Sequence, residues 1–492
     1  MSHLESGGDF LSTNEPVGVK LEASALHQRL LADGGPAVLV ERPLRDDGTA
    51  YDLGLLINLF GTRQRVAAGL GLEPSGLAGL GEFLSFLRSP KPPRNLSDFR
   101  DLLPVAKAGL SSRPKLTRQD RHLEDVDPDL GILPVQTCWP GDAGPLITWP
   151  IVITRPPGAD DPRDYNLGVY RMQVLDGQRA ILRWLPFRGG AQHYREWSRT
   201  NEPMPVAVVI GCDPATLLSA VLPAPGDVGE LTLAGVLQGE ASRLVPCSNI
   251  AMHVPASAEI VLEGTVRPGD MAMEGPFGDH TGYYNDAASY PVFHLEAMKV
   301  RRGAPYLSTF TGRAPDEPSV IGEAMIDVFL PLLKQAIPEI RDLHLPPATC
   351  SYRTAVLQID KSYPGQARRV MMGFWSLLPQ FSMTKYIIVV DADVDIRDWD
   401  EVMWAVATRS DPERDLLTIN STPVDQLDFA SPREGLGGKL GIDATVKIGT
   451  ETQRPFAEAL RMPADVVARA ETIFSRIVSG RTQPIRRNEE VT

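Results

Sequence analysis

The sequence predicts an α+β protein in which a strand-rich middle segment lies between two regions of alternating helices and strands. Helical and strand patterns alternate over about the first 125 residues, strands dominate from 127 to 305, and the alternation returns from 306. Alternation is typical of α/β regions, whereas a long run of strands indicates a barrel or a sandwich. We therefore divide the chain into 1–126, 127–305, 306–450 and a C-terminal helix and tail at 451–492.

The first region contains local signals for helices and strands. Helical spacing that ends at a glycine predicts a helix over 25–34, and an apolar run predicts a strand over 36–43. Residues 53–72 predict a strand, a glycine turn and a helix. The proline-rich stretch 89–104 predicts a surface connection.

The middle segment is predicted to be mainly β. Apolar runs rich in branched residues predict strands over 147–157, 167–185, 203–214, 257–266 and 290–300. The "LDGQ" sequence at 175–178 is a hairpin signal. Residues 181–197 are interpreted as the returning strand, with a turn at Arg188-Gly189-Gly190.

The last region is predicted to alternate again. Helices are expected over 324–340, 366–381 and 463–480, and residues 385–409 predict a strand, an acidic loop and a helix. The loop residues Asp391, Asp393 and Asp395 are spaced like the start of a calcium loop. Ile396 stands where that loop requires glycine, so a strand end and a helix start are favoured. The glycine-rich run 435–441 is interpreted as either a mobile loop near a pocket or a plain flexible loop.

Composition excludes several classes of protein. The 492 residues carry a net charge of −13, which argues against general nucleic-acid binding. No apolar run approaches the roughly 20 residues of a membrane span, and the first residues do not resemble a secretory signal. The four cysteines are far apart in the sequence, so neither a zinc site nor a disulfide framework is expected, and the expected compartment is a reducing cytoplasm.

The stretch "EGPFGDHTGYY" places two carboxylates, Glu274 and Asp279, on either side of a Gly-Pro-Phe-Gly sequence. On a straight strand their side chains would point to opposite faces, but a bend at the glycine and proline can bring them together. Two converging carboxylates are typical of acid–base chemistry, of a metal site, or of a polar turn. The stretch alone leaves all three open.

A second group of polar residues lies in the middle segment. Arg171, within "NLGVYRMQV", needs water or a carboxylate if its strand is otherwise apolar, and an edge-strand arginine is the alternative. Arg188 begins the predicted Arg-Gly-Gly turn and Arg183 precedes it, and these arginines suit a phosphate cradle. His193 alone would be a structural histidine, but with Asn166 and a carboxylate nearby it would suit Mn²⁺.

Many stretches in consistent order carry a family resemblance. They include "NLFGT", "CWPGDAGPLITWP", "NLGVYRMQV", "RWLPFRGGA", "PASAEIVLEG", "EGPFGDHTGYY", "TGRAPDEPSVIG", "RVMMGFWS", "TKYIIVVDADVDIRDWDEVMWAVATRSDP" and "TPVDQLDFASP". From about residue 55 to 450 the chain resembles the UbiD family of prenylated-FMN-dependent decarboxylases, most of all the bacterial 3-octaprenyl-4-hydroxybenzoate carboxy-lyase branch. The resemblance implies a split β-barrel flavin-binding domain between an N-terminal α/β region and a C-terminal α/β oligomerisation domain.

The resemblance also implies roles for individual residues. The expected catalytic residues are Arg171, Glu274 and Asp279, with Asp279 as the proton donor. The expected metal ligands are Asn166, His193 and Glu230, for Mn²⁺ with K⁺ as a further candidate ion. The residues expected to contact the cofactor are Val169, Tyr170, Arg171, Arg183, Trp184, Leu185, Arg188, Gly189, Gln192, His193 and Lys385. For Lys385, a surface lysine at a strand start is the alternative.

The implied activity is reversible, non-oxidative decarboxylation of an aromatic or α,β-unsaturated acid. The first-choice substrate is 3-polyprenyl-4-hydroxybenzoate of ubiquinone biosynthesis, and the alternative is another aromatic, heteroaromatic or unsaturated acid. The implied partners are a flavin prenyltransferase that supplies the cofactor and further copies of the chain, as a dimer or hexamer. A polyprenylated substrate would also bring the enzyme to a membrane surface. A flavin-binding assembly protein without turnover is the hypothesis from another class.

Overall fold

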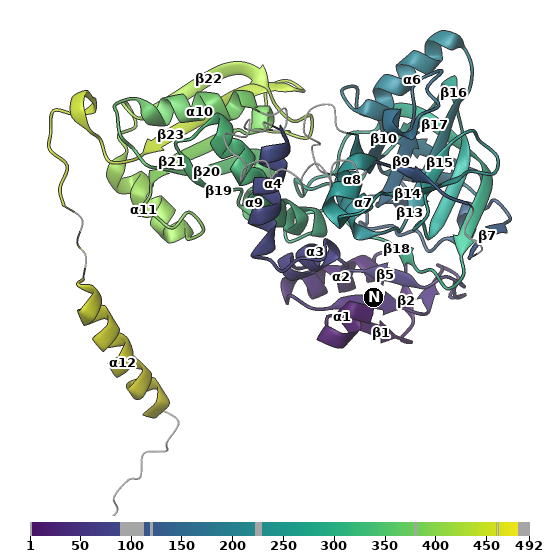
Figure 1. Cartoon of the computed structure of the whole chain (residues 1–492), viewed down its shortest axis with the longest axis horizontal. Helices are drawn as coiled ribbons and strands as arrows, with labels where there is room; N and C mark the ends of the chain where they lie inside the picture. Colours follow the sequence, from purple (N-terminus) through teal and green to yellow (C-terminus); the bar gives the residue numbers. More distant parts are fainter. Residues whose placement is uncertain are drawn as a thin grey trace, which may run out of the picture. The chain divides into compact units, whose positions relative to one another are not determined.

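The computed structural model describes residues 2–88, 113–118, 122–221, 229–377, 381–458, 460 and 462–480 (Figure 1). The proline-rich connection predicted over 89–104 lies outside these residues. Contacts divide the chain into one large unit, 1–362 with 366–445, and a small unit, 363–365 with 446–492. Within the described part, no helix is long and apolar enough to cross a lipid bilayer.

The N-terminal part is a small α/β layer built on one four-stranded sheet, ordered β1-β3-β5-β18. The helix and strands predicted over 25–34, 36–43 and 53–72 are confirmed as α2, β3, β5 and α3. The elements of this part are α1 (Ser2–Gly7), β1 (Phe10–Thr13), β2 (Val17–Gly18), α2 (Glu22–Ala32), β3 (Ala37–Val40), β4 (Pro43–Leu44), β5 (Leu55–Ile57), α3 (Arg63–Gly69), α4 (Gly76–Arg88) and β18 (Tyr306–Leu307).

The central part is one curled antiparallel sheet, ordered β10-β9-β13-β16-β17-β12-β11-β8, with β7 paired to β17. Its strands are β7 (Leu123–Val126), β8 (Leu146–Ile147), β9 (Pro150–Thr154), β10 (Asn166–Val169), β11 (Met172–Asp176), β12 (Arg179–Leu182), β13 (Met204–Ile210), β16 (Ile260–Glu274) and β17 (Ala288–Arg301). A smaller sheet pairs β6 (Lys115–Leu116), β14 (Arg243–Pro246) and β15 (His253–Pro255).

The order of these strands explains the split barrel. β10 ends one side of the sheet and β11 lies beside the last strand of the other side, yet only Tyr170 and Arg171 separate them in sequence. Two linking residues span at most about 10 Å, so the two sides of the sheet must curl towards each other. The hairpin predicted at 175–178 is confirmed, since it joins β11 to β12. The strand expected before it is divided in two, because the chain leaves one side of the sheet at Tyr170 and joins the other after Arg171.

Helices also replace part of the predicted β structure. The returning strand predicted over 181–197 ends at Leu182, and α6 (Gly189–Thr200) begins directly after Arg188. The Arg-Gly-Gly sequence therefore starts a helix and does not make a hairpin turn. Figure 1 shows α6 beside β10. Two more helices, α7 (Pro214–Ser219) and α8 (Glu230–Gln238), complete this part.

The C-terminal α/β part has a five-stranded sheet, ordered β19-β20-β21-β23-β22. Alternate residues of β20 and β21 pack on opposite faces, so both faces are buried. Helices α9 and α10 cover one face and α11 covers the other (Figure 1). The elements are α9 (Glu317–Ala336), β19 (Ile340–His344), β20 (Thr354–Ile359), α10 (Gln366–Leu377), β21 (Tyr386–Asp391), α11 (Trp399–Arg409), β22 (Leu416–Pro423) and β23 (Leu436–Ala444).

Three predictions in this part have clear outcomes. Helix α9 starts earlier than predicted because the Asp316 side chain caps it, accepting from the Ser319 N–H at 3.0 Å. Asp391 ends β21, and it pairs with Arg409 together with Asp393, which fits a strand end and not a calcium loop. The prediction of a glycine-rich loop over 435–441 is wrong, because Leu436–Ala444 form β23, which pairs with β21 and β22.

In the small unit, the predicted final helix is confirmed as α12 (Ala464–Gly480).

Candidate active site

The loop between β16 and β17 carries the centre of the site. Glu274 is the last residue of β16, and Gly275 follows it with φ at +87°, a conformation that favours glycine. The Gly275 N–H donates to the Gln173 side chain of β11 at 2.9 Å, which fixes the turn against the barrel. The chain therefore bends at the position expected from the sequence and returns Asp279 towards Glu274.

Arg171, at the seam between β10 and β11, binds both carboxylates. Its Nε donates to Glu274 Oε1 and its Nη1 to Asp279 Oδ2, each at 2.8 Å. Its Nη2 donates to Asn285 Oδ1 at 2.7 Å, and the guanidinium lies 5.2 Å from the centre of the Phe277 ring. Charge-assisted bonds from every guanidinium nitrogen make Arg171 a rigid anchor for the two acids.

Sequence reasoning did not identify Asn285, although its function in the loop is clear. Its Oδ1 also accepts from the Phe277 N–H at 3.1 Å, and its Nδ2 donates to the Asp286 carbonyl at 2.7 Å. The asparagine therefore holds the loop and Arg171 together. Its signal in the sequence is its place directly after the stretch "EGPFGDHTGYY", which ends at Tyr284.

Asp142 supports the same loop from another segment. Its Oδ1 accepts from the Gly278 N–H at 2.9 Å, and its Oδ2 accepts from the N–H groups of Cys138 and Trp139 at 3.1 and 2.9 Å. A cavity of about 20 Å³ lies here, between Asp142 and Arg171. Burial raises the pKa of Asp142, although three N–H donors and the nearby Arg171 oppose this effect.

A histidine that sequence reasoning did not place, His280, contacts Asp279 directly. Its Nδ1 lies 2.9 Å from Asp279 Oδ1, and its Nε2 lies 3.5 Å from Asp425 Oδ2, in the segment after β22. Burial lowers the pKa of His280, but the two carboxylates outweigh this effect and raise it to about 9. Burial raises the pKa of Asp279, but His280 and Arg171 outweigh it and lower the value to about 2. Asp279 is therefore ionised at neutral pH.

The residues expected to hold a flavin lie around the seam and the start of α6. Tyr170 Oη accepts from Asn166 Nδ2 at 3.2 Å and from the Gly190 N–H at 3.4 Å. Arg188 is the N-cap of α6, and a helix N-terminus with nearby cations suits a phosphate. Glycine is required here, because a Cβ at Gly190 would lie 2.6 Å from Trp184 Nε1.

Unpaired polar atoms in this region fit a bound cofactor. Arg183 Nη1, Trp184 Nε1 and Glu274 Oε2 are buried without a hydrogen-bond partner, although Arg183 lies 3.6 Å from Glu274 Oε2 in an ionic contact. Buried donors are rarely left without a partner, so these residues fit a polar group such as a flavin ring edge. The other expected contacts, Val169, Leu185, Gly189 and Gln192, lie on β10, before α6 and within α6.

The three expected metal ligands converge on the start of β10. Asn166 is its first residue and pairs across the sheet with Thr154, whose hydroxyl lies 2.9 Å from His193 Nδ1. Glu230, the first residue of α8, accepts from the Leu167 N–H at 3.3 Å. Burial lowers the pKa of His193, which favours the neutral imidazole that binds metals, and burial raises the pKa of Glu230.

The donor chemistry of this set suits a divalent ion such as Mn²⁺, with one amide oxygen, one imidazole and one carboxylate. Within the described ranges, this region included, no group of three or more His, Cys, Asp or Glu side chains is arranged to hold a metal. The expected set contains two residues of these types, His193 and Glu230, with the amide of Asn166 as the third.

Lys385 is not free to bind a phosphate in this structure. It lies just before β21, and its Nζ contacts Asp428 Oδ2 at 2.9 Å. Arg353 also contacts Asp428, at 3.4 Å. Binding a phosphate would require Lys385 to leave this partner.

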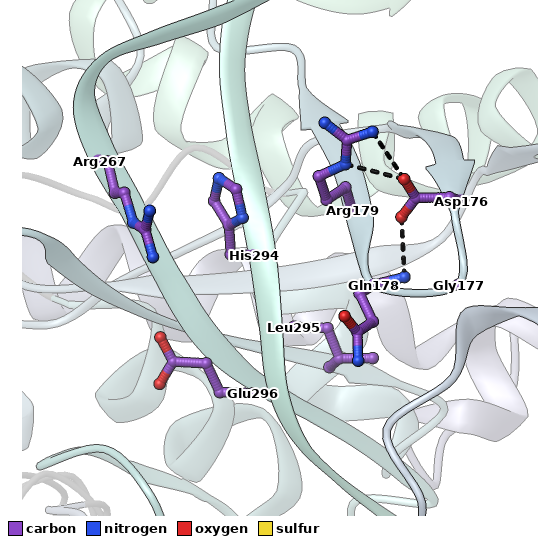
Figure 2. Close-up of a pocket in the computed structure, with 8 residues that line it drawn as sticks. All are labelled: Asp176, Gly177, Gln178, Arg179, Arg267, His294, Leu295 and Glu296. Carbon is purple, nitrogen blue, oxygen red and sulfur yellow. Dashed lines mark hydrogen bonds and ion pairs between the residues drawn. The ribbon is translucent and has the colours of Figure 1, made fainter.

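A hollow of about 480 Å³ lies elsewhere on the central sheet and contains none of the expected site residues (Figure 2). Figure 2 shows Arg179 turned towards Asp176 on the β11–β12 hairpin, with His294 and Arg267 on neighbouring strands. His294 Nε2 lies 2.6 Å from Asp270 Oδ2, so this region holds a second histidine–aspartate pair.

Comparisons with known proteins identify the family and the fold. Three family models match, described as the N-terminal domain (residues 1–84), the Rift-related domain (110–314) and the C-terminal domain (319–444) of 3-octaprenyl-4-hydroxybenzoate carboxy-lyase, UbiD. The UbiD-class enzyme HmfF from Pelotomaculum thermopropionicum, solved with FMN, is 30% identical over 96% of this chain and 98% of its own, with a TM-score of 0.77. An evolved dimeric form of HmfF was solved with prFMN, with 29% identity, the same coverage and a TM-score of 0.75.

A further solved structure has the same fold at lower identity. Vanillic acid decarboxylase from Sedimentibacter hydroxybenzoicus, in its closed form, is 24% identical over 97% of both chains, with a TM-score of 0.79.

Proposed function

Since the chain belongs to the UbiD family of carboxy-lyases, we propose that it is a prenylated-FMN-dependent decarboxylase of an aromatic or α,β-unsaturated acid, with Asp279 as the proton donor. The observation that carries this proposal is Arg171 bound at 2.8 Å to both Glu274 and Asp279, beside buried polar atoms without partners. A flavin scaffold without turnover would not need two acids held on one arginine. The first-choice substrate is 3-polyprenyl-4-hydroxybenzoate. The alternative is another aromatic, heteroaromatic or unsaturated acid.

The residues of the chain would divide the work as follows. Tyr170, Trp184 and the start of α6 would hold the cofactor, and Asn166, His193 and Glu230 would hold a divalent ion such as Mn²⁺. The prenylated flavin supplies the electron sink for the charge left when CO₂ departs. The protein side chains carry out the other tasks: they position the substrate acid, exclude water and deliver one proton.

The proton must reach the carbon that loses CO₂. Arg171 holds both Asp279 and Glu274 in place by hydrogen bonds of 2.8 Å, so Asp279 can carry a proton to the substrate without moving away. Glu274 is fully buried and Asp279 nearly so, which keeps water from competing at this centre. The same groups operate in reverse for carboxylation.

Partners follow from this chemistry. A flavin prenyltransferase has to supply the cofactor, and we propose a homo-oligomer, which the evolved dimeric form of HmfF supports. The relatives are named for different acids, so the family alone does not select the substrate.

The test is CO₂ release from a panel of acids by protein co-expressed with a flavin prenyltransferase. The panel contains 3-polyprenyl-4-hydroxybenzoate, simpler hydroxybenzoates, heteroaromatic acids and cinnamic acids. Protein made without the prenyltransferase is the matched control. The proposal predicts CO₂ only from the first preparation, whereas full cofactor content with no CO₂ from any acid would favour a flavin-binding assembly protein.

A further inference from the structure

We propose that His280 is the proton store for Asp279, so that Asp279, His280 and Asp425 form a relay that recharges the proton donor in each cycle. This inference rests on the proposed function, because it assigns the source of the proton that Asp279 delivers. His280 does not touch the substrate in this scheme and acts through Asp279.

The geometry of the contact supports proton transfer. His280 Nδ1 lies 2.9 Å from Asp279 Oδ1, within the range for proton transfer. The backbone N–H of His280 donates to the same oxygen at 2.8 Å, so the ring and the carboxylate are locked together. The other carboxylate oxygen, Oδ2, accepts from Arg171 Nη1 at 2.8 Å.

The far side of the imidazole faces a second carboxylate. Asp425 Oδ2 lies 3.5 Å from His280 Nε2, an ionic contact longer than a hydrogen bond. The same carboxylate accepts from Tyr352 Oη at 2.8 Å and lies 3.3 Å from Arg353 Nη2. Tyr352 and Arg353 therefore fix Asp425 in position to stabilise an imidazolium.

All the charged groups that face His280 from neighbouring elements are consistent with a protonated ring. Asp279 lies on its own loop, Asp425 lies after β22, and Asp316 at the start of α9 interacts electrostatically with it. The positive charges nearby, Arg171 and Arg353, are each paired with one of these acids. The imidazolium is therefore the stable form, and it gives up a proton only when the charge on Asp279 is relieved.

The proton balance is simple. A carboxylate that is ionised at neutral pH holds no proton to give, so one must first move to it. A substrate carboxylate brought beside Arg171 adds negative charge, which raises the proton affinity of Asp279. The proton on His280 Nδ1 then passes to Asp279 Oδ1, and Asp279 passes a proton to the carbon that has lost CO₂. The ring that has given up its Nδ1 proton keeps the proton on Nε2, which is buried beside Asp425. The proton on Nδ1 is restored from solvent in this scheme, since the side chain is 22% exposed.

The first arm of the test needs neither cofactor nor substrate. ¹⁵N NMR of histidine-labelled protein would follow the titration of His280, assigned as the signal lost in His280→Gln among eight histidines. We expect a value near 9 in the parent chain and a fall of about one pH unit or more in Asp279→Asn, since an opposite charge at this distance has that effect. A His280 value that is the same in Asp279→Asn and the parent chain would overturn the coupling.

The second arm uses protein loaded with prenylated FMN and measures exchange of the product's hydrogen with deuterium from solvent. We expect His280→Gln and His280→Ala to slow exchange and turnover about 10²-fold with normal cofactor content, and added imidazole to restore part of the rate in His280→Ala. His294→Gln is the matched control, because it removes the histidine of the surface His294–Asp270 pair. Parent-like exchange in His280→Gln with full cofactor would overturn the proposal.

The two arms separate this inference from the proposed function. If the loaded parent protein acts on no acid, the proposed function fails, and the NMR arm still decides whether Asp279 and His280 share a proton. If the parent is active and the histidine variants are slow without imidazole rescue, His280 is structural and the relay is wrong.

Discussion

Raising the pH should remove a defined part of the protein's stability through His280. Its pKa is about 9 in the folded chain against an ordinary value of 6.5, because burial, which lowers it, is outweighed by Asp279 and Asp425. The gap of 2.5 between these values, at 1.36 kcal/mol per pH unit, corresponds to about 3 kcal/mol. A raised pKa stabilises the folded chain below pH 6.5, and the contribution is lost as the pH rises through 9.

The assay is urea unfolding of the parent chain and of His280→Gln between pH 6 and pH 10, followed by tryptophan fluorescence. The difference in the free energy of unfolding should be greatest at pH 6 and should shrink by about 3 kcal/mol by pH 10. Effects of the substitution that do not involve a proton stay constant with pH and cancel. A difference that is flat across this range, or that grows with pH, would refute the assignment of a proton to His280.

Three further predictions test the cofactor region and its support. Glu230→Ala should lower metal and flavin content together, and full flavin in a metal-free protein would remove the bridging role. Asp142→Ala should lower kcat about tenfold with little change in KM, since three N–H groups lose their acceptor, and an unchanged kcat would contradict this. Gly190→Ala should lower flavin absorbance because its Cβ would meet Trp184, whereas Gly79→Ala, with open space around it, should not.

Local patterns were enough to predict most elements and the bend at Glu274. Apolar runs located β9, β13, β16 and β17, and helical spacing located α9, α10 and α12. The Gly-Pro sequence after Glu274 predicted a bend that brings Asp279 back, and the structure places both acids on Arg171. These features depend on residues close together in the sequence.

Features that depend on distant residues were missed. The α6 sequence begins with two glycines and follows a strand, which resembles a hairpin. The helix depends on packing against distant residues: a Cβ at Gly189 would lie 2.0 Å from Asn166 Oδ1 of β10. The glycines of β23 fit a strand because neighbours pack closely on them: a Cβ at Gly441 would lie 2.4 Å from the sulfur of Met371. Asp425 meets His280 only through the fold, so neither the raised pKa of His280 nor the lowered pKa of Asp279 could be predicted.

The most direct test of the central claim is deuterium exchange of the product by Asp279→Asn loaded with prenylated FMN. The substitution keeps the size of the side chain and an oxygen for Arg171 but removes the carboxyl proton. We predict normal cofactor and metal content, with exchange and CO₂ release reduced by about 10² to 10⁴-fold. Exchange at the parent rate in this variant would contradict the account, because the proton would then come from a group other than Asp279.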